Sequence, residues 1–156
     1  MPRKKKKREG KVKNATKVKI DGITFRSKLE GYCYTKLKEA NIKNEYEELT
    51  ITLIEPFRFN GKYYAGNTYT PDFVGDNFII ECKGFFTDVA RIKWKLFLNN
   101  YVVKKHPEIK IYMLFYNARQ KIYKKSKSTY AEWCEKHGIE WAHRKIKKEW
   151  LSPSKP

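Results

Sequence analysis

The chain has 156 residues, enough for one compact domain, and 40% of them are hydrophobic, so we expect a packed core. The net charge of +18 favours a polyanionic partner, which would be nucleic acid or an anionic membrane. No apolar run approaches the ~20 residues that span a bilayer, and no signal peptide follows the basic start, so we expect no membrane partner. Three cysteines without paired spacing argue against a disulfide framework and favour a cytoplasmic protein.

The first 20 residues differ from the rest, because they hold ten basic residues against one acid, Glu9. Such a block cannot pack, so the sequence predicts a disordered basic arm over residues 1–20 and a single domain over residues 21–156. The arm could be a solubilising tail or an import-like patch. We expect it instead to contact DNA phosphates through Lys4, Lys5, Lys6 and Lys7.

The first element after the arm is a helix, because apolar residues recur at three- and four-residue spacing over residues 25–42. Ser27 is the expected N-cap, and Glu30 follows it at capping-box spacing. Alternating apolar residues then predict one strand over residues 46–59. Asn60-Gly61 is a strong hairpin turn signal.

The remaining elements are short and alternate between strands and helices, which predicts an α/β fold. They comprise a turn at Gly66-Asn67, a turn at Gly75-Asp76-Asn77, strands over residues 78–83, 109–116 and 139–142, and helices over residues 89–103 and 129–137.

The strand over residues 78–83 carries the chemistry. Alternate residues of a strand share a face, so Glu81 and Lys83 point together while Cys82 points the opposite way. The turn after Asp72 folds the chain back and places that carboxylate beside Glu81. Two carboxylates and a lysine therefore converge, as hydrolysis of a phosphodiester requires: the carboxylates hold Mg²⁺, and the lysine serves the attacking water or the developing charge.

An ion pair on a solvated sheet face is the alternative for this set, and E-x-K alone is common. The full pattern is much rarer: Pro71-Asp72, a tight turn, then an apolar strand with E-x-K. Together with the net charge, it predicts a metal-dependent nuclease. Glu30 on spacing alone is a capping or surface residue, although a helix carboxylate beside the sheet could serve a second metal.

Basic residues outside the arm could grip the DNA backbone. The densest group lies in one loop, for which we expect phosphate contacts by Arg119, Lys121, Lys124 and Lys125. For Arg91, Lys93, Lys95, Lys104 and Lys105, on the helix after the active-site strand, a solvated face is an equal alternative. Cys134, His137 and His143 do not have the spacing of a zinc site, and we take the histidines as structural.

Six segments in the same order resemble the endonuclease I family of T-seven-type bacteriophages, which resolve four-way (Holliday) DNA junctions. The similarity runs from about Phe25 to Trp150. It rests on Phe25-Arg26-Ser27 with Leu29-Glu30, Glu45-Tyr46-Glu47-Glu48, Tyr69-Thr70-Pro71-Asp72-Phe73, Glu81-x-Lys83-Gly84, and Cys134-Glu135-Lys136-His137-Gly138-Ile139. The basic arm and the loop over residues 55–68 are longer than this family leads us to expect.

The resemblance implies a PD-(D/E)XK restriction-endonuclease-like core, with a mixed sheet flanked by helices. It implies that Glu30, Asp72, Glu81 and Lys83 form the active site, with Glu45 also implicated. One metal would bind Asp72, Glu81 and the main-chain carbonyl of Cys82, and a second would lie between Glu30 and Asp72. The metal is expected to be Mg²⁺, for which Mn²⁺ substitutes, and no small-molecule cofactor is expected.

The resemblance also implies a homodimer with exchanged strands, in which residues 51–56 cross between subunits and Glu30 acts in trans. The resulting expectation is a structure-selective endonuclease that cuts Holliday junctions and other branched DNA. Two alternatives stay open: a sequence-specific enzyme of homing, restriction or transposase type that uses the same core, and a basic DNA-binding protein without catalysis.

Overall fold

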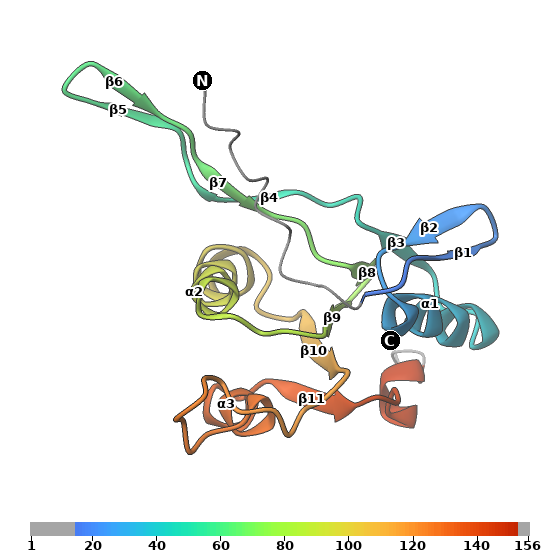
Figure 1. Cartoon of the computed structure of the whole chain (residues 1–156). Helices are drawn as coiled ribbons and strands as arrows, with labels where there is room; N and C mark the ends of the chain where they lie inside the picture. Colours follow the sequence, from blue (N-terminus) through green and yellow to red (C-terminus); the bar gives the residue numbers. More distant parts are fainter. Residues whose placement is uncertain (1–14, 153–156) are drawn as a thin grey trace, which may run out of the picture.

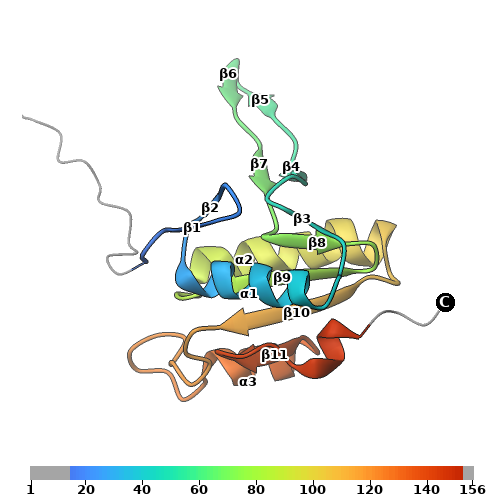
Figure 2. The ribbon, with the colours of Figure 1, turned by 90° about the vertical axis from the view of Figure 1, so that its right-hand side faces the viewer.

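A five-stranded mixed sheet forms the centre of the molecule (Figures 1 and 2). The computed structural model describes residues 15–152. β9, β10 and β11 run parallel to one another, whereas β8 is antiparallel to β9 and β3 is antiparallel to β8. This arrangement confirms the predicted α/β class with a mixed sheet. The strands in spatial order are β11 (Glu140–His143), β10 (Lys110–Phe115), β9 (Phe78–Lys83), β8 (Phe73–Gly75) and β3 (Asn44–Tyr46).

Helices cover both faces of the sheet, and a hydroxyl side chain caps the N-terminus of three of these helices. Ser27, Thr87 and Thr129 each accept a hydrogen bond from the backbone amide three residues on. The predicted Ser27 cap is therefore confirmed. The helices are α1 (Lys28–Glu39), α2 (Asp88–Phe97), which continues as the π-helical η1 (Leu98–Val103), α3 (Tyr130–Lys136) and the 3-10 helix η2 (Lys148–Leu151).

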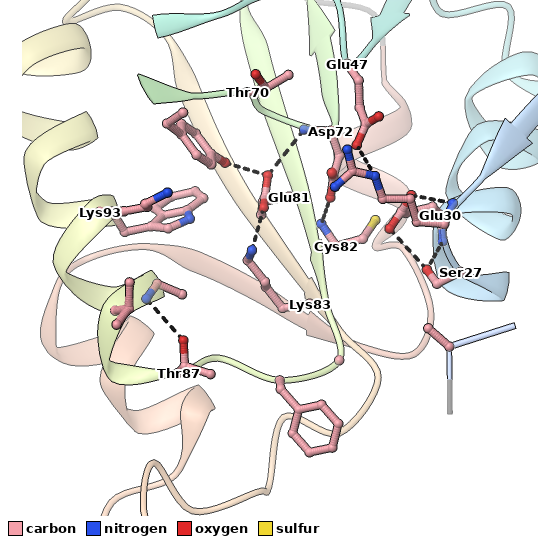
Figure 3. A pocket seen from close by; sticks show the side chains of 18 of the residues that line it. Ser27, Glu30, Glu47, Thr70, Asp72, Glu81, Cys82, Lys83, Thr87 and Lys93 are labelled. Atoms are coloured by element: carbon pink, nitrogen blue, oxygen red, sulfur yellow. Dashed lines mark hydrogen bonds and ion pairs between the residues drawn. The ribbon is translucent and has the colours of Figure 1, made fainter. Parts of the chain in front are cut away.

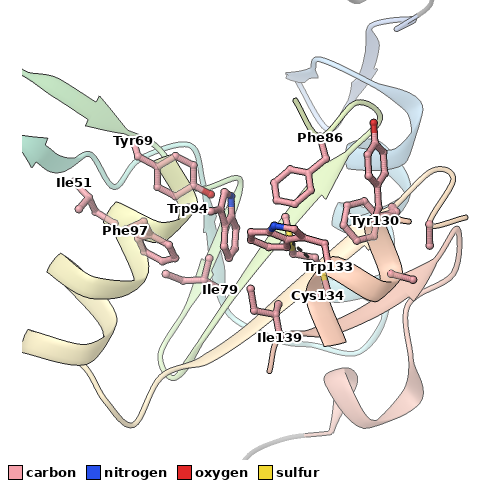
Figure 4. Packing of buried hydrophobic residues seen from close by; sticks show 14 of the residues in the cluster. Ile51, Tyr69, Ile79, Phe86, Trp94, Phe97, Tyr130, Trp133, Cys134 and Ile139 are labelled. Atoms are coloured by element: carbon pink, nitrogen blue, oxygen red, sulfur yellow. Dashed lines mark hydrogen bonds between the residues drawn. The ribbon is translucent and has the colours of Figure 1, made fainter. Parts of the chain in front are cut away.

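The two faces of the sheet carry separate hydrophobic clusters. On one face, Trp94 and Phe97 of α2 and Trp133 of α3 pack against Ile79 and Met113 of the sheet (Figure 4). On the other face, α1 and η2 cover the sheet in a cluster that contains Phe25, Leu37, Phe73, Ile80, Leu114 and Trp150. Consecutive residues of β9 thus enter opposite clusters, as the period of a strand requires.

A long β-ribbon leaves the sheet and projects from the domain (Figures 1 and 2). It consists of β4 (Ile51–Ile54), β5 (Phe57–Phe59), β6 (Lys62–Tyr64) and β7 (Asn67–Tyr69), with β4 paired to β7 and β5 paired to β6. The Asn60-Gly61 turn at its tip has positive φ at both residues, as predicted for a hairpin. Gly66 is required where the ribbon bends, because a Cβ there would lie 2.1 Å from the carbonyl oxygen of Ile54.

Three expectations differ from the structure. The single strand predicted over residues 46–59 is wrong, because Pro56 and the segment 47–50 divide it into β3, β4 and β5. Gly66-Asn67 does not reverse the chain; it continues the ribbon from β6 into β7. Residues 18–20, assigned to the arm, form β1 (Val18–Ile20), which pairs with β2 (Ile23–Phe25) across Asp21-Gly22. The D-G turn signal and the apolar alternation on either side of it were present in the sequence.

Within residues 15–152, no helix combines the length and apolar character needed to cross a bilayer.

Candidate active site

A pocket of about 770 Å³ opens where β9 ends, beside the first turns of α1 and α2 (Figure 3). Four acidic and four basic residues of the described chain line it. The acids Glu30, Asp72 and Glu81 are buried, whereas the bases Lys17 and Arg26 are exposed at the rim. The pocket is therefore negative at its floor and positive at its mouth. The other charged lining residues are Glu47, Lys83 and Lys93.

Asp72 and Glu81 face each other across the β8–β9 hairpin. The backbone amide of Asp72 donates to Oε2 of Glu81 at 3.2 Å, and the amide of Cys82 donates to Oδ2 of Asp72 at 2.8 Å. Phe73 pairs with Ile80 in the antiparallel register. Asp72, which precedes Phe73, therefore lies opposite Glu81, which follows Ile80. The predicted convergence of these two carboxylates is confirmed.

Glu30 reaches the same pocket from the first turn of α1, where a carboxylate also suits the positive end of the helix dipole. Its Oε2 accepts from the Arg26 amide at 3.2 Å and from the Tyr46 hydroxyl at 2.5 Å. The Ser27 hydroxyl donates to its Oε1 at 3.3 Å. Within this one chain, Glu30 lies beside Asp72, so the pocket is complete in cis and a role of Glu30 in trans stays a prediction.

Glu47 is a pocket residue that the sequence analysis missed. Carboxylate oxygens of Glu30, Glu47 and Asp72 all lie within 4.8 Å of one another. Glu47 has a φ of 51°, a left-handed conformation that is rare for a residue with a side chain, and Nε of Arg26 lies 3.0 Å from its Oε1. Its amide donates to the Asp72 carbonyl at 2.9 Å, which fixes this turn of the chain against the site.

Glu45, the residue expected at the site, is exposed on β3 and does not line the pocket. The hydroxyl of the next residue, Tyr46, points to Glu30, and neighbours along a strand point to opposite faces. Glu45 therefore points away from the pocket. Alternation alone would also turn Glu47 away, and only its left-handed backbone reorients it.

Lys83 and Tyr69 hold the side chain of Glu81. Nζ of Lys83 lies 2.9 Å from Oε1, and the Tyr69 hydroxyl donates to Oε2 at 2.5 Å. Burial alone would lower the pKa of Lys83, but Glu81 and Asp72 outweigh it and raise the pKa, so Lys83 is a cation. Burial and Glu81 raise the pKa of Tyr69, which keeps its hydroxyl a donor. Tyr69 connects the site to the β-ribbon.

Burial and neighbouring carboxylates disfavour the ionised forms of Asp72 and Glu47 in the metal-free protein. Burial raises the pKa of Asp72 well above its usual range, and Glu81 and Glu30 add to the effect. Burial likewise raises the pKa of Glu47; Arg26 opposes the shift and Glu30 adds to it. A cation between these oxygens would remove the repulsion, and hard oxygen ligands are those that Mg²⁺ prefers. The cluster is thus compatible with metal binding.

The chain is similar to known proteins over most of its length. The profile of the Phage endonuclease I family matches residues 11–155. The chain is 38% identical over 132 residues to Endonuclease I of Escherichia phage T7, covering 84% of this chain and 80% of that protein. It is also 38% identical over 126 residues to Endodeoxyribonuclease 1 of Enterobacteria phage T3, covering 80% and 75%.

The chain belongs to the phage endonuclease I family.

This membership confirms the resemblance, and the fold is consistent with the PD-(D/E)XK core that it implied. The structure brings together four of the five predicted catalytic residues of this endonuclease I relative, namely Glu30, Asp72, Glu81 and Lys83. Cys82 also lines the pocket, and its main-chain carbonyl stays a predicted metal ligand. The catalytic and metal-binding roles of these residues stay predictions.

The predicted DNA contacts divide into two groups. Lys4, Lys5, Lys6 and Lys7 lie outside the described residues. Arg119, Lys121, Lys124 and Lys125 are exposed on the loop between β10 and α3. Lys121 and Lys124 line a groove of about 580 Å³ that shares Phe85 and Thr87 with the active-site pocket, so this basic loop adjoins the site. Lys93 of α2 lines the pocket itself, whereas Arg91 donates to the carbonyl of Phe86 at 2.6 Å.

The residues weighed for a zinc site have structural partners. Sγ of Cys134 lies 3.6 Å from the Met113 sulfur, and Nδ1 of His137 lies 2.8 Å from the Trp133 carbonyl. Nδ1 of His143 accepts from the amide of Ala118 at 3.1 Å, at the start of the basic loop.

Proposed function

We propose that this protein is a metal-dependent, structure-selective DNA endonuclease that cleaves Holliday junctions and other branched DNA by hydrolysis of phosphodiester bonds. One observation carries the proposal: Glu30, Asp72 and Glu81 lie buried with Lys83 in a pocket whose mouth is basic. This is the set of groups that phosphodiester hydrolysis needs, and family membership and the net charge of +18 support DNA as its substrate.

The carboxylates would hold Mg²⁺, for which Mn²⁺ would substitute, with two ions per site. Asp72, Glu81 and the Cys82 carbonyl are the proposed ligands of one ion, and Glu30 and Asp72 those of the other. When bound, the cations lower the pKa of a coordinated water and neutralise charge on the phosphate. Glu47 lies within ligand distance of the second set, so we propose it as an additional ligand there.

The residues around the carboxylates would position the substrate. Lys83 would donate to the attacking water or stabilise the charge that develops on the phosphate; its side chain is 23% exposed and lines the pocket, which supports this role. Lys93 and Arg26, at the rim, would receive the flanking phosphates. These contacts read backbone and shape, and they support structure selectivity rather than base readout.

The test is Mg²⁺-dependent cleavage of a synthetic four-way junction beside a linear duplex of the same sequence. We expect paired nicks near the branch point of the junction, abolished by Glu81→Gln and retained by Glu45→Gln, which changes an exposed carboxylate outside the pocket. Binding without cleavage in Mg²⁺ or Mn²⁺ would leave a DNA-binding protein without catalysis. Cutting of the duplex at defined sites would keep the chemistry and replace the substrate.

We also propose a homodimer, because resolving a junction requires two nicks and each subunit has one site. Exchange of residues 15–50 between subunits would reproduce the same pocket, since α1 and β3 would make the same contacts on the partner's β8 and β9. In an exchanged dimer Glu30 acts in trans; without exchange it acts in cis.

Mixing two inactive variants distinguishes these arrangements. In an exchanged heterodimer of Glu30→Gln and Glu81→Gln chains, one site receives an intact α1 and an intact β9, and the other receives neither. Co-refolding the two variants would then restore nicking of one strand. If Glu30 acts in cis, both sites contain one substitution and the mixture stays inactive.

A further inference from the structure

The tip of the β-ribbon exposes aromatic side chains. Phe57 is 50% exposed, Phe59 is 62% exposed and Tyr63 is 56% exposed, and none of these residues belongs to the two hydrophobic clusters of the described chain. A two-stranded hairpin is marginally stable in water without a covering layer. The exposed rings therefore indicate that this hairpin, residues 57–64, is built to contact a partner.

The rings are distributed over both faces of the hairpin. Phe57 pairs with Tyr64, and their rings stack at 5.0 Å with an interplanar angle of 4°. Phe59 lies on the same face, because alternate residues of a strand point the same way. Arg58 pairs with Tyr63, and these two residues form the opposite face.

A cation accompanies the aromatic residues on each face. The guanidinium of Arg58 lies 5.7 Å from the centroid of the Tyr63 ring, and Nζ of Lys62 lies 5.4 Å from that of Tyr64. No acidic residue occurs in the sequence between Glu55 and Asp72. The hairpin thus combines flat apolar rings with positive charge, which is the chemistry that binds unpaired bases and their phosphates.

The hairpin is an extension of the active-site wall. β7 leads from the hairpin through Thr68 and Tyr69, and Thr70 follows it. All three residues line the pocket, and Tyr69 binds Glu81. Tyr64 precedes Tyr69 by five residues, so it lies at most ~17 Å along the strand from the site. DNA rises ~3.4 Å per base step. If one of its phosphates lies in the pocket, the hairpin is therefore less than one helical turn of DNA away.

From these contacts we infer that the hairpin of residues 57–64 binds bases at the branch point of the DNA substrate whose faces lack a stacked neighbour, with its aromatic rings stacked on those bases. The inference rests on the proposed function and names the substrate feature that selects branched DNA. Within an intact duplex, the neighbouring base pairs cover both faces of every base. The rings on the two sides of the narrow hairpin can therefore stack on bases only where the strands separate.

A second copy of the chain fits this surface less well. Each face of the hairpin offers only two to four side chains, whereas a stable protein interface buries ~800 Å² per partner. Arg58 and Lys62 of two copies would also repel each other, with no acid of the hairpin to pair with them. The same charges attract DNA.

The test is equilibrium binding without divalent ions, with a four-way junction that carries 2-aminopurine next to the branch point and with a linear duplex. Phe59→Ala and Tyr63→Ala remove one ring from each face. We expect each to weaken junction binding about 10-fold, to lose the fluorescence change of 2-aminopurine, and to alter duplex binding less than about 2-fold. Phe59→Trp, which keeps a ring, and Val103→Ala, which shortens an exposed apolar side chain on η1, should bind as the wild type does.

Three outcomes would overturn the inference: unchanged junction binding by both alanine variants, an equal loss on junction and duplex, or a change of oligomeric state in sedimentation, which would make the hairpin a subunit contact. Wild-type cleavage of the junction in Mg²⁺ is measured in parallel. If the wild type cleaves the junction and the hairpin variants bind it normally, only the inference about the hairpin is refuted. If the wild type neither binds nor cuts the junction, the proposed function is refuted.

Discussion

We expect the Asp72 carboxylate, a proposed metal ligand, to destabilise the metal-free protein. Its carboxylate is buried beside Glu30 and Glu81, and this surrounding raises its pKa. Two unit charges at the 4.8 Å limit of the carboxylate cluster repel by ~3.5 kcal/mol at an effective dielectric constant of ~20. Arg26 and Lys83 offset part of this repulsion. We therefore expect Asp72→Asn to stabilise the metal-free protein by about 2 kcal/mol.

The amide keeps the contact that fixes this position, because its oxygen can still accept from the Cys82 amide. In a protein of this length, about 2 kcal/mol raises the Tm by about 4–8 °C. A raised carboxyl pKa means that the stability of the wild type is greatest below the ordinary Asp pKa and is lost as the pH rises through the folded-state pKa. The advantage of the variant should therefore vanish in acid, below about pH 3.9.

Thermal unfolding in EDTA and in Mg²⁺ measures this effect. Divalent ions should raise the Tm of the wild type more than that of Asp72→Asn, and the variant should not cleave DNA. Asp76→Asn is the matched control: it removes the same charge from an exposed turn and should not stabilise a chain with a net charge of +18. A metal-free Asp72→Asn protein that is less stable than the wild type would refute the reasoning, since Lys83 and the Cys82 amide would then outweigh the repulsion.

Substitutions at Glu47, in the basic loop and at His143 test three other features of the molecule. Glu47→Gln should weaken Mn²⁺ binding about 10-fold in calorimetry whereas Glu45→Gln leaves it unchanged; equal effects would remove Glu47 from the metal site. Replacing Lys121 and Lys124 together by Ala should lower the slope of log Kd against log salt by about 1–2, and an unchanged slope would exclude phosphate contacts. Burial, Arg144 and Arg119 lower the pKa of His143, so its contribution to stability is present above about pH 6.5 and is lost in acid. The urea stability gap to His143→Ala should shrink below that pH, and a constant gap would contradict this.

Several local structural features could be predicted from the sequence because each depends on only a few residues. The Ser27 cap, the Asn60-Gly61 turn and the alternation of Glu81 and Lys83 each depend on neighbours within four positions, and the structure has all three. The β8–β9 turn then placed Asp72 opposite Glu81 by register alone.

The missed features depend on contacts between distant segments. Nothing in Glu45-Tyr46-Glu47 tells which glutamate enters the site, because the left-handed turn at Glu47 forms only where its amide reaches the Asp72 carbonyl. Tyr69 read as a strand residue, and its bond to Glu81 depends on how the ribbon returns to the sheet. The sequence predicts a turn at Gly66-Asn67 because glycine serves both turns and bends, and only the approach of the Ile54 carbonyl distinguishes them.

Because of how the carboxylates are anchored, we expect substitution to separate the fold from the proposed chemistry. Asp72 and Glu30 are each held by a donor that an amide side chain can also satisfy, the Cys82 amide in one case and the Arg26 amide in the other. Exchanging oxygen for nitrogen therefore removes charge and leaves the hydrogen bonds that define the turns. Glu81 is the exception, because Lys83 is paired with its charge. Glu81→Gln should consequently be the least stable of the three amide variants, since it leaves a half-buried ammonium without its counter-ion.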